Sequence, residues 1–337
     1  MLIKKKRGWE LPESRVISES RYFNRRQIVK ALGLGTIGAG TASIWTGCVD
    51  DETIKNPIEI APPFDEDVPA EIRAYYPADP NPDFAEVPPG REMTPEDIAA
   101  TYNNFYEFGI DKTKVHIYAR SLVTRPWEVE ITGLCRNPRT MDPDDFYAEF
   151  GIEERIYRHR CVERWSMVVP WVGFPLYKLV ELADPTSDAR FVQFTSFYEP
   201  SQAVGQQTLT QYNWPYYEAL TLAEATNELA FAGLGIFDHT LPQQHGAPFR
   251  LVLPWKYGYK SIKSIVKIEF MAEMPHTFWN DRNPEEYGFT SNIDPNMPHP
   301  RWSQMVERDI GTDEEIDTLL YNGYEEWVGD LYKRGRV

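Results

Sequence analysis

The longest informative pattern in the chain runs from Ile156 to Leu182, where charged positions give way to apolar ones. Cationic side chains alternate before Cys161, and an apolar run follows a few residues later. We interpret the string 171–175, Trp-Val-Gly-Phe-Pro, as a turn. From Pro175 onward apolar residues recur at helical spacing, and proline suits the first position of a helix. The pattern predicts a helix from Pro175 that buries Leu176, Leu179, Val180 and Leu182.

Shorter patterns predict strands and one further helix. Acidic residues follow Thr94-Pro95, which is typical of a helix start. Residues 127–133, 190–197 and 264–270 have the composition or alternation of strands, and residues 243–255 read as a loop that leads into a strand. Short strands and isolated helices without a repeated β–α–β rhythm indicate an α+β fold.

The first 48 residues have the pattern of an export signal. A basic start and the pair Arg25-Arg26 precede a weakly apolar segment, 31–47, that is too short and glycine-rich for a membrane-spanning helix. Paired arginines before such a segment are typical of the twin-arginine (Tat) signal, so we expect a periplasmic protein. A basic anchoring helix is the alternative. The string Thr46-Gly47-Cys48 is similar to a lipoprotein cleavage box, although Trp45 departs from it, and lipidation of Cys48 stays open.

Composition divides the remainder into two parts. Residues 49–99 are rich in proline, aspartate and glutamate, which predicts an extended acidic linker. Residues 100–337 are left for one catalytic domain. The net charge of −16 argues against nucleic acid as a partner, because phosphate binding needs a basic face. Three cysteines without a C-x-x-C motif exclude a disulfide framework, and Cys135 has no evident mate.

Candidate chemistry centres on Cys161, which follows Arg158 and Arg160. A lone cysteine is most often a buried small hydrophobe. The other reading is a thiolate that neighbouring guanidinium charge favours and that ligates a soft metal. Two further segments suit ligand binding: Arg250 is able to hold an anion with paired hydrogen bonds, and Lys263 adds a compact cation.

The string Arg160-Cys161-Val162-Glu163 and the segment 102–108, YNNFYEF, resemble the periplasmic protein-methionine-sulfoxide reductases (the MsrP family) of the sulfite-oxidase superfamily. The resemblance extends from Tyr102 to the C-terminus and includes the twin-arginine signal. It implies the sulfite-oxidase-type α+β fold and one molybdenum held by molybdopterin, with Cys161 as the thiolate ligand. Glu163 would modulate protonation near the metal, or would instead pair with Arg160 or Arg164.

The resemblance also implies a set of cofactor-binding residues. Three of them differ from the residues of the reductase family. Ser196 stands where the family has Thr, and Ser261 stands where the family usually has Gly. His245 replaces an Asn of the reductases and is typical of sulfite oxidases. The string 299–304, which recurs in the family, is expected to pack rather than to react. The expected cofactor-binding set is Asn103, Asn104, Tyr106, Glu107, Ser196, His245, Arg250, Ser261, Ile262 and Lys263.

The implied activity is removal of oxygen from methionine sulfoxide residues in oxidised periplasmic proteins. Because the chain has no haem-attachment, iron–sulfur or dinucleotide motif, electrons would come from a haem-containing membrane subunit of the MsrQ type. A peptidyl substrate would require a shallow pocket at Cys161. The alternatives are a sulfite dehydrogenase, a reductase of small sulfoxides or N-oxides, and an exported binding lipoprotein without activity.

Overall fold

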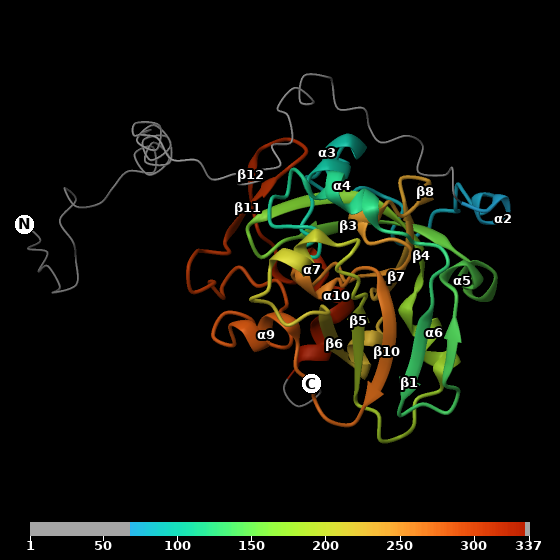
Figure 1. Cartoon of the computed structure of the whole chain (residues 1–337). Helices are drawn as coiled ribbons and strands as arrows, with labels where there is room; N and C mark the ends of the chain where they lie inside the picture. Colours follow the sequence, from blue (N-terminus) through green and yellow to red (C-terminus); the bar gives the residue numbers. More distant parts are fainter. Residues whose placement is uncertain (1–67, 334–337) are drawn as a thin grey trace, which may run out of the picture. The chain divides into compact units, whose positions relative to one another are not determined.

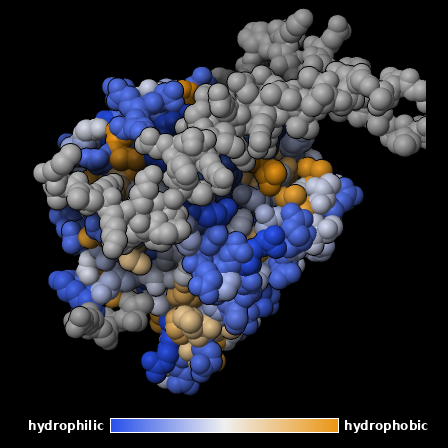
Figure 2. All heavy atoms as spheres, turned by 90° about the vertical axis from the view of Figure 1, so that its left-hand side faces the viewer, coloured by the Kyte–Doolittle hydropathy of each residue, from blue (hydrophilic) through white to orange (hydrophobic). Residues whose placement is uncertain are grey.

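The computed structural model describes residues 68–333, which are coloured in Figure 1. Arg25, Arg26 and Cys48 of the expected export signal lie outside the described residues, as does the first part of the expected linker. Among the described residues, no helix is long and apolar enough to cross a membrane. Where described residues are visible, the face in Figure 2 is mostly hydrophilic with scattered hydrophobic side chains.

Two sheets form the framework. The first has five strands in the order β2-β1-β10-β5-β6, and β1–β10 is its parallel pair. The second has seven strands: β12-β11-β4-β7-β8 with β3 on β4 and β9 on β7. Both sheets mix parallel and antiparallel pairs, which confirms the α+β prediction. The strands are β1 Val129–Gly133, β2 Arg139–Met141, β3 Glu153–Arg160, β4 Trp165–Pro175, β5 Phe191–Ser196, β6 Tyr217–Thr221, β7 Phe231–Ile236, β8 His239–Thr240, β9 Arg250–Val252, β10 Ile265–Met271, β11 Val306–Asp309 and β12 Glu315–Asp317.

Short helices connect the strands and cover the sheets (Figure 1). The α-helices are α2 Ala70–Arg73, α3 Glu96–Thr101, α4 Val115–Tyr118, α5 Pro143–Phe150, α6 Leu176–Ala183, α7 Val204–Thr208, α8 Leu222–Ala225, α9 Phe278–Arg282 and α10 Glu325–Val328. The 3-10 helices are η3 Ala119–Ser121, η4 Gln243–His245, η5 Gly258–Lys260, η6 Leu320–Gly323 and η7 Gly329–Tyr332.

Strand β4 is the buried centre of the second sheet. All eleven of its residues are buried, and it pairs with β3 along its length and with β7 along its C-terminal half. The predicted turn at 171–175 is therefore wrong, because these residues are the last five of β4. Gly173 is needed for close approach rather than for turning, since a Cβ on it would lie 2.0 Å from the Ala232 carbonyl oxygen. The ladder shifts register between Val172 and Gly173, which marks a bulge.

The strands predicted from local alternation are confirmed. Residues 190–197 contain β5, in which every second residue is buried, and residues 264–270 overlap β10. The predicted helix after Pro175 is α6, which buries Leu176, Leu179, Val180 and Ala183. Pro175 itself caps this helix and ends β4. One hydrophobic core contains residues of both sheets, including Trp171 and Phe174 of β4 and Phe194 of β5.

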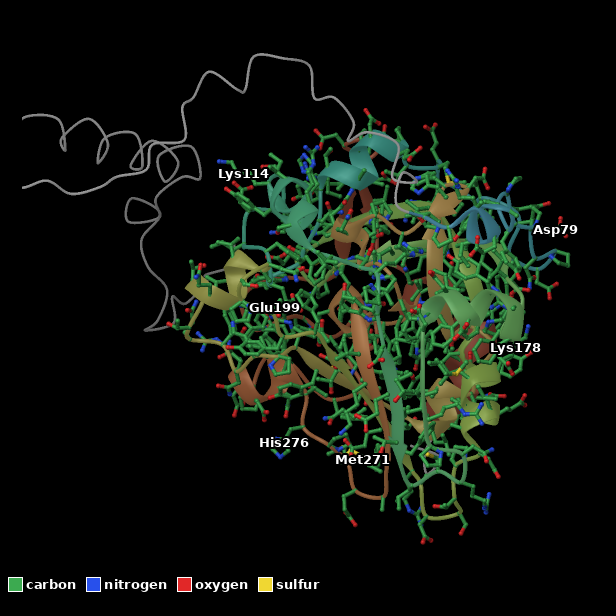
Figure 3. All side chains as sticks on the ribbon, turned by 45° about the vertical axis from the view of Figure 1, so that its right-hand side comes forward. Asp79, Lys114, Lys178, Glu199, Met271 and His276 are labelled. Carbon is green, nitrogen blue, oxygen red and sulfur yellow. The ribbon has the colours of Figure 1, made fainter. Side chains whose placement is uncertain are left out.

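The described part of the expected linker packs against the domain. Asp79, labelled in Figure 3, accepts a backbone hydrogen bond from Glu154 at the start of β3. Phe84 is 6% exposed and lies edge-on against Tyr157 of β3. Thr94 exchanges two hydrogen bonds with the backbone of Val168 in β4. Residues 79–94 therefore run along the β3–β4 pair, while the boundary at residue 99 stays a prediction.

We predict that Gly173→Ala lowers the free energy of unfolding by ~3 kcal/mol or more, at the upper end of overpacking costs, because backbone atoms of β7 leave the methyl group no space. Chemical denaturation monitored by tryptophan fluorescence measures this change. Gly288→Ala is the matched control, because no atom lies within 4 Å of its added Cβ, and its effect should stay within about 0.5 kcal/mol. Equal stability of the two variants would contradict the close approach of β4 and β7.

Candidate active site

A cavity of about 400 Å³ is lined by residues that lie between positions 102 and 302. It brings together eleven of the twelve predicted site residues, although their individual roles stay predictions. The twelfth, Ser196, is not among the lining residues. The eleven are Asn103, Asn104, Tyr106, Glu107, Cys161, Glu163, His245, Arg250, Ser261, Ile262 and Lys263.

Cys161 lies in the four-residue turn that joins β3 to β4. The amide of Cys161 donates to the Trp165 carbonyl at 2.9 Å, and the amide of Arg164 donates to the Cys161 carbonyl at 3.1 Å. Arg164 has φ +68°, a left-handed conformation that closes the turn at some cost in strain for a residue with a side chain. The Glu163 amide donates to the thiol Sγ at 3.4 Å. The turn thus points Sγ into the cavity from a rigid hairpin.

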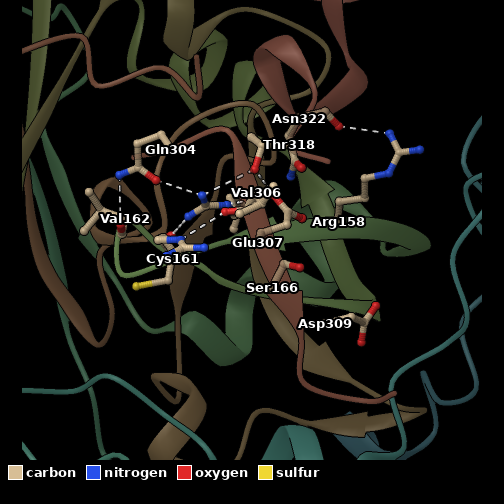
Figure 4. A network of polar contacts seen from close by, with 12 residues as sticks. Arg158, Cys161, Val162, Ser166, Gln304, Val306, Glu307, Asp309, Thr318 and Asn322 are labelled. Carbon is tan, nitrogen blue, oxygen red and sulfur yellow. Dashed lines mark hydrogen bonds and ion pairs between the residues drawn. The ribbon is translucent and has the colours of Figure 1, made fainter. Parts of the chain in front are cut away.

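The arginines near Cys161 do not act on the thiol as expected. Successive residues of a strand face opposite sides, so Arg158 and Arg160 share the face of β3 opposite to that of Cys161. Arg158 donates to the Asn322 carbonyl (Figure 4). Arg160 pairs with Glu307. Burial, reinforced by Glu163, raises the pKa of the Cys161 thiol to about 12. Arg160 and Lys112 lower this pKa, but by less than burial and Glu163 raise it, so the thiolate stays a prediction; the charge of a coordinated metal ion would favour it.

Glu163 lies beside the thiol at the edge of the cavity. Its Oε2 is 3.7 Å from Sγ, accepts from Asn104 Nδ2 at 2.9 Å, and pairs with Lys112 Nζ at 3.1 Å. Asn104 Nδ2 also lies 3.2 Å from Sγ. The alternative pairing of Glu163 with Arg160 or Arg164 is wrong, because Arg160 pairs with Glu307 and Arg164 with Glu315.

Two buried cations of the cavity have no carboxylate in an ion pair with them among the described residues. Arg250 donates to the carbonyl oxygens of Leu251, His245 and Ser261, and burial lowers its pKa to about 9. Lys263 Nζ donates to the Asn104 carbonyl at 2.9 Å, and burial together with Arg250 lowers its pKa to about 7. Three of the five guanidinium N–H groups are thus used, which leaves two for a ligand.

Two neighbouring buried lysines, unlike Arg250 and Lys263, form ion pairs with carboxylates. Lys256 pairs with Glu224 at 2.5 Å and Lys260 pairs with Glu218 at 2.7 Å, and all four side chains are buried. The chain therefore neutralises buried cations elsewhere in this region. The charge of buried Glu107 raises the pKa of Lys263, but the two side chains form no ion pair. Because buried charges without a paired counterion are costly, Arg250 and Lys263 fit an anionic group such as a phosphate. His159 and His245 face the same cations, and burial lowers the pKa of each well below its ordinary value, so both are neutral hydrogen-bonding groups.

Two further polar side chains belong to this region: Asn103 is suited to bind a ligand, and Ser196 supports a segment that lines the cavity. Asn103 Nδ2 donates to the Ala99 carbonyl, whereas its buried Oδ1 has no hydrogen-bond partner and lies on a residue that lines the cavity. Such an orphan acceptor suits an N–H donor of a heterocycle. Ser196 lies on the buried face of β5 and donates to the Lys263 carbonyl at 2.8 Å, so it supports the Lys263 segment from behind.

The donor set fits molybdopterin better than a metal bound by protein side chains alone. Within residues 68–333, no group of three or more His, Cys, Asp or Glu side chains is arranged to hold a metal ion. The cavity supplies one buried thiol, two cations without an ion pair and one orphan acceptor. A metal at Cys161 would therefore take its other ligands from a cofactor whose phosphate lies near Arg250 and Lys263.

Residues 116–279, a little under half of the chain, match the family described as the oxidoreductase molybdopterin binding domain. The solved structure of the sulfane dehydrogenase SoxCD from Paracoccus pantotrophus is similar at a TM-score of 0.42 and 13% identity, over 65% of this chain. The present chain spans 56% of that chain. The domain match confirms the expected cofactor, molybdenum held by molybdopterin, and places the chain among oxidoreductases. It names no substrate.

Several cavity residues were not predicted as site residues. His159 was missed, although it lies two positions before Cys161 on the same face of β3, which is a signal available from strand periodicity. Gly258 accommodates the His159 ring, since a Cβ there would lie 2.6 Å from Nε2. Arg301 and Trp302 belong to the string expected only to pack, yet both line the cavity. Nothing local to that string indicates this placement.

We predict that Lys263→Met stabilises the cofactor-free protein at pH 7 and weakens cofactor retention, because it removes a buried cation without a paired carboxylate. Below pH 7 Lys263 is charged in both the folded and unfolded states, and the burial penalty is present in full. Between pH 7 and its ordinary value of 10.5 the unfolded state binds the extra proton, so wild-type stability rises with pH relative to the variant.

Thermal unfolding of both proteins between pH 6 and 10, with pterin content determined separately, measures these effects. Lys260→Met is the matched control: it leaves the buried Glu218 carboxylate without its cation and should destabilise the protein. Destabilisation by Lys263→Met of similar size would show that Lys263 is an ordinary structural cation.

Proposed function

We propose that this chain is a molybdenum-pterin reductase that removes the oxygen atom from methionine sulfoxide side chains in proteins. The observation that carries the proposal is the environment of Cys161, where a thiol, a carboxylate and aromatic side chains meet. The bound molybdenum centre supplies oxygen-atom transfer and a two-electron redox change. The protein contributes binding, orientation and proton delivery.

Each cavity region has its own task in this proposal. Cys161 Sγ ligates the metal, and Arg250 and Lys263 bind the phosphate end of the cofactor. Asn103 Oδ1 accepts a hydrogen bond from the heterocycle. Removal of a sulfoxide oxygen as water consumes two protons. Glu163 is suited to deliver them, because its side chain is 34% exposed and also lies next to Sγ.

Local charge favours a neutral sulfoxide over sulfite as the substrate. Glu163 is the carboxylate nearest to Sγ, and its partner Lys112 is already paired with it. Arg301 at the rim pairs with Glu286 at 2.7 Å. A sulfite dianion that approached Cys161 would meet this carboxylate, whereas a sulfoxide carries no net charge. His245 lies beside Arg250 rather than beside Glu163, so its identity bears on phosphate binding rather than on substrate.

The rim also suits a thioether side chain. Tyr102, Trp165 and Trp302 line the cavity and are aromatic, and sulfur makes favourable contacts with aromatic rings. Arg282, Asn283 and Arg301 line the same cavity and are exposed, so it opens to solvent. Cys161 itself is only 6% exposed, and the thiol therefore lies deeper than the expected shallow pocket. A methionine sulfoxide on a flexible segment has the length to extend past this rim.

The substrate test compares two reactions of the purified holoprotein. Reduction of an oxidised, methionine-rich protein is followed with a reduced viologen as electron donor, and sulfite oxidation is followed with a ferric acceptor. We expect sulfoxide reduction and little sulfite oxidation. Cys161→Ser should abolish turnover, because a hydroxyl is a harder and weaker donor than a thiolate.

Three other results would change the proposal. Sulfite oxidation without sulfoxide reduction would identify a sulfite dehydrogenase. Activity on small sulfoxides or N-oxides alone would remove the protein-repair role. Full activity of Cys161→Ser with molybdenum retained would contradict the assignment of the metal ligand.

We further propose that the chain works in the periplasm with a membrane-bound electron donor. The sequence has no haem-attachment or iron–sulfur motif, so a haem-containing subunit of the MsrQ type fits as the source of electrons. Export through the Tat pathway carries proteins that are already folded, which suits a chain that binds its cofactor before export. An anchor at Cys48 would keep the enzyme close to that donor.

We predict that replacing both Arg25 and Arg26 by lysine leaves the precursor in the cytoplasm, because the Tat receptor recognises the arginine pair rather than charge alone. Cell fractionation and immunoblotting measure the distribution. Exchange of Lys4 and Lys5 for arginine keeps the same total charge and should leave export unchanged. Normal periplasmic arrival of the double lysine variant would exclude Tat dependence.

A further inference from the structure

Side chains hold the backbone carbonyls of Cys161 and Val162 (Figure 4), and those that hold Val162 come from a distant part of the sequence. Gln304 Nε2 and Trp302 Nε1 each donate to the Val162 carbonyl at 2.9 Å. Arg160 Nη1 donates to the Cys161 carbonyl. All three donors belong to side chains, so the β3–β4 turn is fixed by more than its own backbone ladder.

The guanidinium group of Arg160 is itself held on several sides. Nε donates to Glu307 Oε2 at 2.7 Å, and Nη2 donates to Gln304 Oε1 at 2.8 Å. Thr318 Oγ1 donates to the same Glu307 oxygen at 2.9 Å. Arg160 is 0% exposed and Glu307 is 2% exposed. Gln304 thus connects Arg160 to the Val162 carbonyl, and the contacts form one buried network.

A second arginine extends this network to the N-terminal segment. Arg91 Nε donates to Asp309 Oδ2 at 3.0 Å, Nη1 to Glu307 Oε1 at 3.3 Å and Nη2 to Ser166 Oγ at 3.1 Å. Asp309 and Ser166 are register partners in the parallel pair of β11 and β4. Arg91, Trp302, Gln304 and Glu307 all lie outside residues 116–279, the part of the chain that matches the molybdopterin-binding domain.

Trp302 contacts both the cavity and the backbone of the β3–β4 turn. It lines the cavity, and its ring stacks on His299 with centroids 3.9 Å apart. The same ring holds the Val162 carbonyl through its N–H group. Because Sγ is separated from the backbone by one rotatable bond, rotation of the peptide planes at Cys161 and Val162 would swing the sulfur within the cavity.

We propose that Trp302 and Gln304 are positioning residues, which act with the Arg160–Glu307 pair to fix the direction of the Cys161 thiolate toward the metal. This inference rests on the proposed role of Cys161 as the metal ligand. Groups that orient a metal ligand from outside the coordination sphere tune the metal as well as hold it. Loosening the two Val162 hydrogen bonds should therefore change the metal's electronic structure without releasing it.

The test uses the full-length holoprotein and the variants Trp302→Phe and Gln304→Met, singly and together. Trp302→Phe keeps an aromatic ring that can stack on His299 and loses the N–H donor together with one ring of the indole. The readouts are molybdenum content, the electron paramagnetic resonance spectrum of Mo(V), and kcat and KM with an oxidised protein. Trp127→Phe is the matched control, because it loses a buried indole hydrogen bond, to the Ile265 carbonyl at 2.8 Å, away from Cys161.

We expect both single variants to keep molybdenum, to shift the g-values of Mo(V), and to lose about 10-fold in kcat with KM little changed. The double variant should shift the spectrum further. Trp127→Phe should lower the melting temperature and leave the spectrum unchanged. Gln304→Met also removes the buried hydrogen bond from Arg160, so Trp302→Phe is the decisive variant: a wild-type spectrum and kcat in this variant would overturn the proposal.

The spectrum of Cys161→Ser separates this inference from the proposed function. If serine at this position leaves the Mo(V) spectrum unchanged, Cys161 is not a metal ligand. The positioning role of Trp302 and Gln304 is then wrong as well. If serine alters the spectrum while Trp302→Phe does not, Cys161 is a ligand and only the positioning role is wrong.

Discussion

Burial of β4 on both faces, with backbone pairing along both edges, is the constraint on which the site depends. A strand in this position has no freedom to shift register, because each register step would expose apolar residues and break hydrogen bonds to two neighbours. Its N-terminal end carries the turn with Cys161, and its neighbour β7 pairs with β9, which begins at Arg250. One sheet thus places both the thiol, at the end of β4, and Arg250, in β9, with β7 between the two strands.

The buried cations fall into two groups, those with a carboxylate in an ion pair and those without one. Arg160, Lys256 and Lys260 are buried with carboxylate partners, and these pairs contribute to a defined structure. Arg250 and Lys263 are buried without an ion pair, although the charge of Glu107 acts on Lys263, and we expect both cations to destabilise the empty protein. The presence or absence of an ion-pair partner distinguishes structural cations from cations that are available to a ligand. Burial alone would not distinguish the two groups.

Much of the framework was predictable because its signals are local. The alternation in β5 and the helical spacing of α6 extend over a few residues, and both elements form where that spacing places them. Gly173 was misinterpreted as part of a turn. A glycine is required there because the Ala232 carbonyl of another strand leaves no space for a side chain. Arg158 and Arg160 were interpreted as direct partners of the thiol, whereas Arg158 donates to the Asn322 carbonyl and Arg160 contacts the backbone of Cys161 and pairs with Glu307. The placement of Trp302 depends on tertiary packing, which no window around residue 302 contains.

The cavity draws its lining from residues between Tyr102 and Trp302, which spans most of the domain. A ribosome that has synthesised only the first two hundred residues has not yet supplied Arg250, Lys263 or Trp302, so a nascent chain has no complete site. Insertion of the cofactor into a complete site consequently requires that these late segments have been synthesised. Since a bound ligand stabilises the folded state by mass action, loaded chains resist unfolding and proteolysis better than empty ones. If Arg250 and Lys263 hold the cofactor as proposed, the same two cations give the cell a means to remove chains that never received it.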